Sequence, residues 1–461
     1  MARGGESLYN RETVASKVSD SRLGRLGKLV SLSGKVSGNL IARTASKLAG
    51  KDGAWAERRT ARQLVKTLGS MKGLAQKLGQ AMSMDIDHLP AEMRDIISAL
   101  QSKSEPMAYE AIAAVVEEEL GAPPLKLFAS FERVPLAAAS LGQVHRATLK
   151  DGTLVVVKVQ YPGAASALAA DLKNIDVLLR AAGGVMGAMG AQLKGQGYFD
   201  EVASELTLET DYVREARNCR EFARLVQPFP ELCVPQVFSE FSASRVLTLE
   251  YLAGEPLSDL LKRSSNESNA RRFEVSRQLI AALFGPLLAS GVVHADPHPG
   301  NFLLLPDGRL GLLDFGAIKR LSADFRDGNR AAFRALLDGV PPDFPALLRA
   351  AHFDVGAAPG EVAPLFSQFF RVLRQPVEGD HFDYATTQMR QQFEALARLH
   401  VSTLVKLKPP AEGLMLFRAL GGQAQNLRAI GAAGNFRAAY ASVFARALVG
   451  LPETQERPSA A

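Results

Sequence analysis

The pattern of apolar and polar positions divides the chain into a helical segment, a short β-rich segment and a longer helical segment. Between residues 63 and 120 the apolar positions recur at the spacing of amphipathic helices. The turn-forming residues 121–124 follow, and the pattern between residues 128 and 160 becomes that of strands. Strand character returns over residues 231–252, and from Gly254 onward helical spacing dominates. This order predicts an α+β protein with a small β-rich lobe and a larger helical lobe.

Two hairpins are predicted from two-residue Asp-Gly turns. The runs GQVHRATLK and TLVVVKVQ flank Asp151-Gly152, and the apolar runs of LLLPDGRLGLLDF flank Asp307-Gly308. Asp-Gly favours the tight turn that joins two antiparallel strands. The longest apolar window, residues 279–295, contains Gly, Pro, Ser and His and is shorter than a bilayer requires. It predicts a buried helix that leads into a strand.

The length of the chain allows two or three domains, and its composition is that of a globular protein. The chain has 461 residues, of which 47% are hydrophobic and 22% are charged. We place segment boundaries where the sequence pattern changes. The segments are a basic, partly flexible N-terminal arm (1–62), a helical extension (63–127), a β-rich lobe (128–252), a helical lobe (253–450) and a disordered polar tail (451–461).

The excess of positive charge lies in the N-terminal arm. The net charge is +6, while residues 1–62 alone carry +8 because they hold 13 Lys and Arg against 5 Asp and Glu. The arm is interpreted as a flexible solvated segment, with contact to a membrane surface as the alternative. A single Trp, and no interleaving of basic with aromatic residues, argue against binding to nucleic acid.

The cysteines and the absence of targeting patterns indicate the cellular compartment in which the protein is expected. Cys219 and Cys233 form neither a disulfide framework nor a metal-ligand spacing, which favours a reducing compartment. The sequence shows no secretory leader pattern and no apolar run long enough to cross a bilayer. We therefore expect a cytoplasmic protein, or one that is peripheral to the inner face of a membrane without a transmembrane segment.

The candidate chemistry is concentrated in residues 291–319, GVVHADPHPGNFLLLPDGRLGLLDFGAIK. The hairpin in this stretch is expected to bring Asp296, Asn301 and Asp314 to one end, as oxygen ligands suited to Mg²⁺. Asp-x-x-x-x-Asn followed by Asp-Phe-Gly is the phosphoryl-transfer pattern of protein kinases. The interval of 13 residues from Asn301 to Asp314 fits that pattern. His294 and His298 are interpreted as structural supports of the loop, with metal binding as the alternative for His298, although imidazole is a poor ligand for Mg²⁺.

A kinase-like site also needs a strand lysine for the phosphates and a carboxylate that holds this lysine. Lys158 is the only charged residue in the predicted strand LVVVKVQ. The predicted helix ELTLETDYVREARNCREF offers two i,i+4 pairs of acidic residues, Glu205 with Glu209 and Asp211 with Glu215. Ordinary surface helices are equally acidic, so spacing alone does not choose the partner of Lys158.

Four motifs in this order resemble those of the UbiB/ADCK (AarF-type) family of atypical protein-kinase-like proteins of coenzyme Q biosynthesis. They are KLGQ (77–80), the alanine-rich PLAAASLGQVHRA (135–147), LETDYVREA (208–216), and HADPHPGN with LLDFG (294–316). The likeness extends over residues 65–330 and more loosely to 430. It implies a protein-kinase-like two-lobed fold, with a β-rich N-lobe, a helical C-lobe and an added N-terminal helical extension that carries the KxGQ motif.

The resemblance implies a role for each residue of the catalytic and metal loops. Lys158 becomes the lysine that binds the phosphates of ATP, and Glu215 becomes its ion-pair partner. Asp296 corresponds to the catalytic aspartate of kinases, and Asn301 and Asp314 correspond to the Mg²⁺ ligands. ATP and Mg²⁺ are therefore the expected cofactors.

The other family motifs imply a restrained nucleotide site. The residues concerned are Lys77, the loop residues Ala137, Ala138, Ala139 and Ser140, the E-x-D pair Glu209 and Asp211, and the hinge residues Glu250 and Leu252. Alanines in place of the glycines of protein kinases stiffen the loop at the phosphates. Lys77 is expected to reach toward the E-x-D pair or the nucleotide, and the hinge is expected to meet adenine through its backbone.

We expect an ATP- and Mg²⁺-dependent kinase-like ATPase that supports ubiquinone or related isoprenoid-lipid biosynthesis. Protein phosphorylation is disfavoured, because the resemblance implies that the KxGQ helix covers the peptide site. Two alternatives stay open: a kinase for a small molecule or lipid, and a nucleotide-sensing scaffold without enzymatic activity. The expected partners are ATP, prenylated quinone precursors or other proteins of the ubiquinone pathway, and a membrane surface contacted through the basic arm.

Overall fold

The computed structural model describes residues 106–138, 141–170, 172–173, 207–355, 359–408 and 410–449. Apart from residues 170, 172 and 173, these belong to one compact unit, Lys72–Ala169 with Lys194–Ala461. The N-terminal arm, the segment with Lys77, the loop residues Ala139 and Ser140 and the C-terminal tail lie outside the described residues. What the sequence analysis expects of them stays a prediction.

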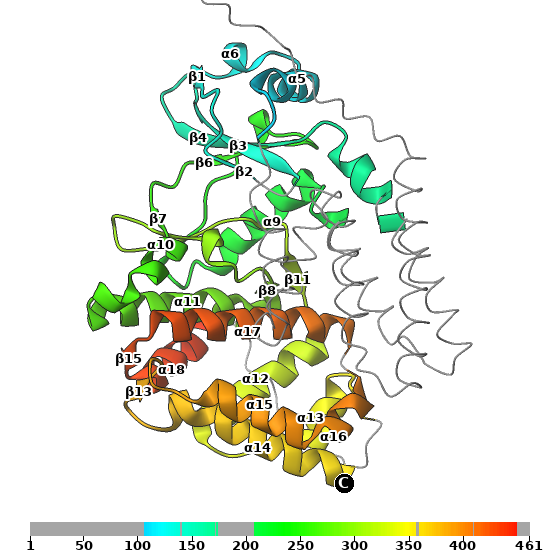
Figure 1. The fold of residues 1–461 in the computed structure, drawn as a ribbon, viewed down its shortest axis with the longest axis vertical. Coiled ribbons are helices and arrows are strands. Elements are labelled where there is room, and N and C mark those ends of the chain that lie inside the picture. Colours follow the sequence, from blue (N-terminus) through cyan, green and yellow to red (C-terminus); the bar gives the residue numbers. More distant parts are fainter. Residues whose placement is uncertain are drawn as a thin grey trace, which may run out of the picture. The chain divides into compact units, whose positions relative to one another are not determined.

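The described helices comprise two helices before the sheet, one helix between the lobes and the helices of the C-terminal lobe (Figure 1). They are α5 (Tyr109–Leu120), α6 (Pro124–Leu127), α9 (Tyr212–Leu225), α10 (Leu257–Lys262), α11 (Asn269–Ser290), α12 (Ala323–Asp338), α13 (Phe344–Ala350), α14 (Pro359–Glu378), α15 (Met389–Leu399), α16 (Val401–Lys406), α17 (Ala411–Ile430) and α18 (Phe436–Ala447), with the 3-10 turns η2 (Ser239–Phe241), η3 (Ser264–Asn266) and η4 (Pro299–Asn301).

An antiparallel sheet forms the N-terminal lobe. Its strands are β1 (Ser130–Phe131), β2 (Ala137–Ala138), β3 (Gly142–Thr148), β4 (Leu154–Gln160) and β6 (Val246–Glu250), in the order β1-β3-β4-β6 with β2 paired to β3. Thr148 pairs with Leu154 across the predicted Asp151-Gly152 turn, which confirms this hairpin. Gly152 has a φ of 92°, a conformation that glycine adopts without strain.

Alternation along β4 separates a core face from the face that carries Lys158. Val157 and Val159 are fully buried and pack with Ile112 and Val116 of α5, which covers this side of the sheet. Successive side chains of a strand point to opposite faces. Lys158 therefore lies on the other face, toward α9.

Helix α9 begins at Tyr212, later than the sequence analysis predicted. We expected one helix that includes Glu205 to Glu215, but residues 209–210 form a turn. Asp211 caps α9 by accepting a hydrogen bond from the N–H of Arg214 at 2.8 Å. A side-chain acceptor at this position stabilises the start of a new helix. The prediction of a continuous helix was therefore wrong across the E-x-D pair.

Helix α11 is the buried centre of the helical lobe. Its residues Leu279, Ile280 and Ala281 are fully buried, and its neighbours include α17 and α18. After Gly291, which has a φ of 68°, the chain enters β8 (Val292–His294). This arrangement confirms the buried helix and following strand predicted for the longest apolar window. Among the described helices, none combines the length and the apolar character that a bilayer crossing requires.

Short strands carry the candidate loops. β9 (Phe302–Leu304) and β10 (Leu310–Leu312) form the second predicted hairpin, and β5 (Leu232–Cys233) and β7 (Glu255–Pro256) complete its sheet. β8 pairs with β11 (Ile318–Arg320) beside it. Two further pairs lie in the helical lobe: β12 (Asp354–Val355) with β14 (Leu407–Lys408), and β13 (Phe382–Asp383) with β15 (Ala433–Gly434). The loops that follow β8 and β10 carry the predicted catalytic and metal-binding residues.

Candidate active site

Lys158 and Glu215 form the central ion pair of the candidate site. The Nζ of Lys158 donates to both carboxylate oxygens of Glu215, at 2.8 and 2.9 Å. It also lies 3.8 Å from the Oδ1 of Asp314 and 5.0 Å from the ring centroid of Tyr212. β4, α9 and the loop after β10 thus bring one lysine against two carboxylates, and the expected pairing of Lys158 with Glu215 is present.

Burial makes this pair electrostatically strong. The side chain of Glu215 is 3% exposed and that of Lys158 is 16% exposed. Burial by itself lowers the pKa of Lys158, but the charges of Asp314 and Glu215 outweigh it and hold this pKa well above its ordinary value. Burial raises the pKa of Glu215 against the opposing charge of Lys158. Lys158 therefore stays a cation in the folded protein.

Asp314 follows β10 in a left-handed backbone conformation, with a φ of 58°. Its Oδ1 accepts a hydrogen bond from the N–H of Gly316 at 3.2 Å. Asp and Asn tolerate this conformation better than other non-glycine residues. A Cβ at Gly316 would lie 3.2 Å from the Oδ1 of Asp314, 3.8 Å from Glu209 and 3.9 Å from Glu215. Three acidic side chains therefore converge at this glycine.

Helix α9 also holds the Asp-Phe-Gly loop, through two residues that the sequence analysis did not single out. The fully buried Asn218 donates from Nδ2 to the backbone oxygen of Phe315 at 2.9 Å. Arg214 donates from Nη1 to the backbone oxygen of Gly316 at 3.1 Å. The helix that positions Glu215 therefore positions the metal loop as well. A polar residue three positions after Glu215 on an apolar face was the available signal for Asn218.

Hydrogen bonds between its own residues stabilise the loop of Asp296. The Nδ2 of Asn301 donates to the Oδ2 of Asp296 at 2.9 Å, and the backbone oxygen of Asn301 accepts the N–H of Leu313 at 2.8 Å. The Nε2 of His294 lies 3.0 Å from the backbone oxygen of Leu313. The Nδ1 of His298 accepts a backbone N–H two residues further on, at 3.0 Å. Both histidines therefore make hydrogen bonds within this region, as expected of structural supports.

Helix α17 supports the same loop from the C-terminal part of the chain. The Nη2 of Arg418 lies 3.7 Å from the Oδ1 of Asp296. The Nδ2 of Asn426 donates to the backbone oxygen of Pro297 at 2.8 Å. Gly422, between them, packs against the ring of Pro297. The sequence analysis missed these residues because more than 100 positions separate them from the loop.

Replacing Gly422 by Ala is expected to disturb this contact. A Cβ at Gly422 would overlap the Cγ of Pro297, which belongs to a rigid ring that cannot swing aside. Overpacking of this kind costs about 1–3 kcal/mol, and it displaces the loop of Asp296. Urea unfolding measures the loss. Gly413→Ala on the same helix is the control, because its Cβ meets nothing closer than 3.4 Å; equal stability of the two variants would contradict the expectation.

The predicted loop and hinge residues lie at strand ends. Ala137 and Ala138 form β2 and pair with β3, so this half of the alanine-rich loop is a strand. Glu250 ends β6, and its N–H donates to the backbone oxygen of Gln236 at 2.8 Å. That N–H is therefore already used within the lobe. Leu252 lies two residues further on and is 9% exposed.

The E-x-D pair separates in the structure. Glu209 lies beside Gly316, close to Glu215 and the metal loop. Asp211 is instead the cap of α9, where its carboxylate accepts a backbone N–H. The two carboxylates therefore have different surroundings, and the approach of Lys77 to them stays a prediction.

The donor set near Asp314 fits a cation that arrives with a nucleotide. Asn301 uses its side-chain nitrogen on Asp296, so its side-chain oxygen is the atom with which it would bind a cation. Over the described parts of the chain, no three His, Cys, Asp or Glu gather closely enough to hold a metal by themselves. Mg²⁺ usually takes one or two protein ligands together with phosphates and water.

Comparison with known proteins identifies the family of this chain. The ABC1 atypical kinase-like domain matches residues 99–339, more than half of the chain. The chain belongs to this family. The resemblance to atypical protein-kinase-like proteins and the kinase-like α+β fold are thereby confirmed.

Relatives of this ABC1 chain include proteins from plants, yeast and bacteria. It is 32% identical over 325 residues to "Atypical kinase COQ8, mitochondrial" of Saccharomyces cerevisiae. This match covers 68% of this chain and 62% of the yeast protein. It is 36% identical over 268 residues to "Protein ACTIVITY OF BC1 COMPLEX KINASE 8, chloroplastic" of Arabidopsis thaliana, with coverages of 58% and 35%. The match thus spans less than two thirds of each of these relatives.

A solved structure from the same comparison also shares the fold. The complex of Rv3197 with erythromycin from Mycobacterium tuberculosis has a TM-score of 0.57 and 28% sequence identity, and the match covers 84% of this chain and 96% of that one. The likeness therefore extends beyond the residues matched by the ABC1 domain.

Proposed function

We propose that this ABC1-family protein binds ATP with Mg²⁺ between β4, α9 and the loops after β8 and β10, and hydrolyses it. The observation that carries the proposal is the buried pair of Lys158 and Glu215 beside Asp314. In kinase-like sites the lysine binds the phosphates only when this ion pair is formed. Here it is already formed, through two short hydrogen bonds.

Each residue has a defined task in this proposal. Lys158 binds phosphate oxygens, and Glu215 keeps its ammonium group in place. Asn301 and Asp314 hold the cation, which supplies charge neutralisation at the phosphates when it is bound. Asp296 orients the attacking oxygen and accepts its proton. Arg418 stands beside that carboxylate and fixes its direction.

Hydrolysis is favoured over transfer to a protein because the KxGQ segment is implied to cover the peptide site. The biological role we propose is support of ubiquinone or related isoprenoid-lipid biosynthesis, in line with the family resemblance and the mitochondrial yeast relative named as an atypical kinase. The N-terminal basic arm then provides a peripheral contact with the membrane where such lipids reside.

ATP turnover in the presence of lipids tests this role. Phosphate release is measured with and without anionic vesicles and a phenolic mimic of quinone precursors, with Asp296→Asn as the inactive control. Stimulation by vesicles or phenol, lost in the control, supports the proposed role. A protein that binds ATP but shows no turnover under any of these conditions is the nucleotide-sensing scaffold instead.

A further inference from the structure

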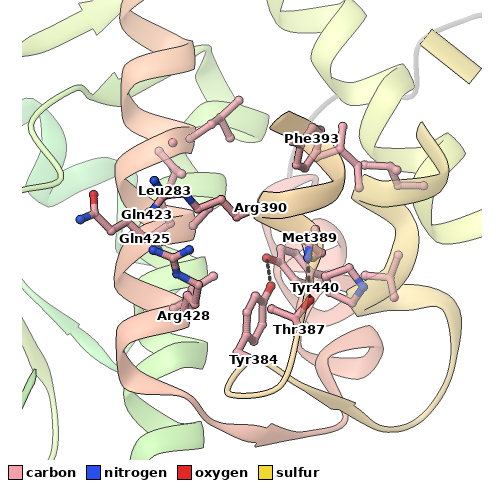
Figure 2. A pocket seen from close by; sticks show the side chains of 18 of the residues that line it. Leu283, Tyr384, Thr387, Met389, Arg390, Phe393, Gln423, Gln425, Arg428 and Tyr440 are labelled. Atoms are coloured by element: carbon pink, nitrogen blue, oxygen red, sulfur yellow. Dashed lines mark hydrogen bonds between the residues drawn. The ribbon is translucent and has the colours of Figure 1, made fainter. Parts of the chain in front are cut away.

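A cavity of about 600 Å³ lies inside the helical lobe, in residues that the proposed ATP site does not use (Figure 2). Its walls come from α11, α12, α14, α15, α17 and α18, and from the segment between β13 and α15. The lining includes Leu283, Phe284, Phe333 and Leu427. Binding sites for small molecules have this size and are mainly apolar with a few polar groups.

The polar groups of the cavity are mostly neutral. The hydroxyls of Tyr384 and Tyr440 lie 3.3 Å apart, within hydrogen-bond distance (Figure 2). Burial raises the pKa of Tyr384 well above its ordinary value and that of Tyr440 to about 12, so both phenols are uncharged at neutral pH. Arg390 and Glu394 lie 2.7 Å apart and neutralise one another. Half-buried Arg428 adds one positive charge.

One buried polar group in the lining lacks a protein partner. Gln423 is 4% exposed, and its Nε2 has no hydrogen bond to any residue that the structure describes. A buried amide without a partner costs about 1–3 kcal/mol. Gln423 is part of the cavity lining, so an oxygen of a bound ligand would satisfy this amide. Figure 2 shows Gln423 on the α17 side of the cavity.

We propose that the cavity binds a neutral, mainly apolar small molecule that carries one hydrogen-bonding oxygen, and that Gln423 is its polar contact. The apolar walls recognise the body of the ligand, and the buried amide selects an alcohol or carbonyl over a pure hydrocarbon. Two buried neutral phenols near the site disfavour a charged head group, because a charge loses its hydration there.

The cavity is lined by α17, the helix that also contacts the loop of Asp296. Gln423 also lines a smaller void of about 20 Å³ that is bounded by His294 and Pro297. On the same helix, Asn426 holds Pro297 and Arg418 approaches Asp296. The ligand would therefore rest against the helix that supports the proposed catalytic loop.

Titration calorimetry of the full chain with 1-decanol tests the site without any reference to ATP turnover. We expect saturable binding to the wild type, and a weakening of about tenfold in Gln423→Leu, which corresponds to one lost hydrogen bond. Ala424→Trp fills the cavity and abolishes binding. Ala429→Trp is the matched control, because Ala429 is exposed on the same helix and is not part of the lining.

Two kinds of outcome would overturn the proposal. If 1-decanol fails to bind the wild type, or binds Ala424→Trp as tightly as Ala429→Trp, the cavity is not the site. If decanoate binds more tightly than 1-decanol and Arg428→Gln removes that preference, the head group is an anion and Gln423 is not its contact. Neither outcome affects the ATP site, which is tested by phosphate release.

Discussion

Replacing Asp314 by Asn is expected to abolish the stabilisation of the protein by Mg²⁺ and ATP. A ligand at 100 times its dissociation constant stabilises a protein by about 2.7 kcal/mol. The variant loses a carboxylate ligand of the cation and keeps nearly the same shape. Asn also tolerates the left-handed backbone found at this position, with its φ of 58°, so the loop is preserved. Thermal unfolding with and without Mg²⁺-ATP measures the effect.

Asp307→Asn is the matched control for this experiment. Asp307 lies in the exposed turn of the same hairpin, where its carboxylate accepts hydrogen bonds from Arg309. Asp307 has no part in the proposed cation site, so Asp307→Asn is expected to keep the full stabilisation by Mg²⁺-ATP. Undiminished stabilisation of Asp314→Asn would contradict the assignment of Asp314 as a metal ligand.

Replacing Lys158 by Met is expected to lower the free energy of unfolding by about 3 kcal/mol, because it leaves the buried Glu215 without its counter-charge. The loss is largest at neutral pH. Burial raises the pKa of Glu215 in the folded state, so acidification protonates it there first and restores part of the stability of the variant. Urea unfolding at several pH values measures both effects.

A double variant separates this explanation from a general loss of packing. Adding Glu215→Gln to Lys158→Met removes the unpaired charge and is expected to recover part of the lost stability. Lys262→Met is the control: Lys262 is 76% exposed in its contact with Asp259, and such surface pairs contribute about 0–1 kcal/mol. A Lys158→Met variant as stable as Lys262→Met would show that the buried pair does not stabilise the fold.

Local chemistry explains why parts of the site were predictable from the sequence. Both hairpins were identified because Asp-Gly turns specify their geometry within a few residues. Lys158 stood out because it is the one charge in an apolar strand. Glu215 did not stand out in this way, since spacing offered several acidic residues and only the family resemblance favoured one.

Other parts depend on contacts between distant segments, which periodicity does not report. Arg418 and Asn426 meet the loop of Asp296 only after α17 has packed beside β8. Asn218 meets the metal loop across the interface of α9. The error at Asp211 was of another kind: an N-cap residue was present in the sequence, but the acidic pattern was extended through it as one helix.

The most direct test of the account is the rate of phosphate release from Mg²⁺-ATP by the wild type, Asp296→Asn and Asp307→Asn. We predict measurable turnover by the wild type and Asp307→Asn. Asp296→Asn is expected to be at least about 100-fold slower, the contribution of a positioned proton acceptor. Turnover by Asp296→Asn at the wild-type rate would contradict the assignment of this site as the centre of ATP hydrolysis.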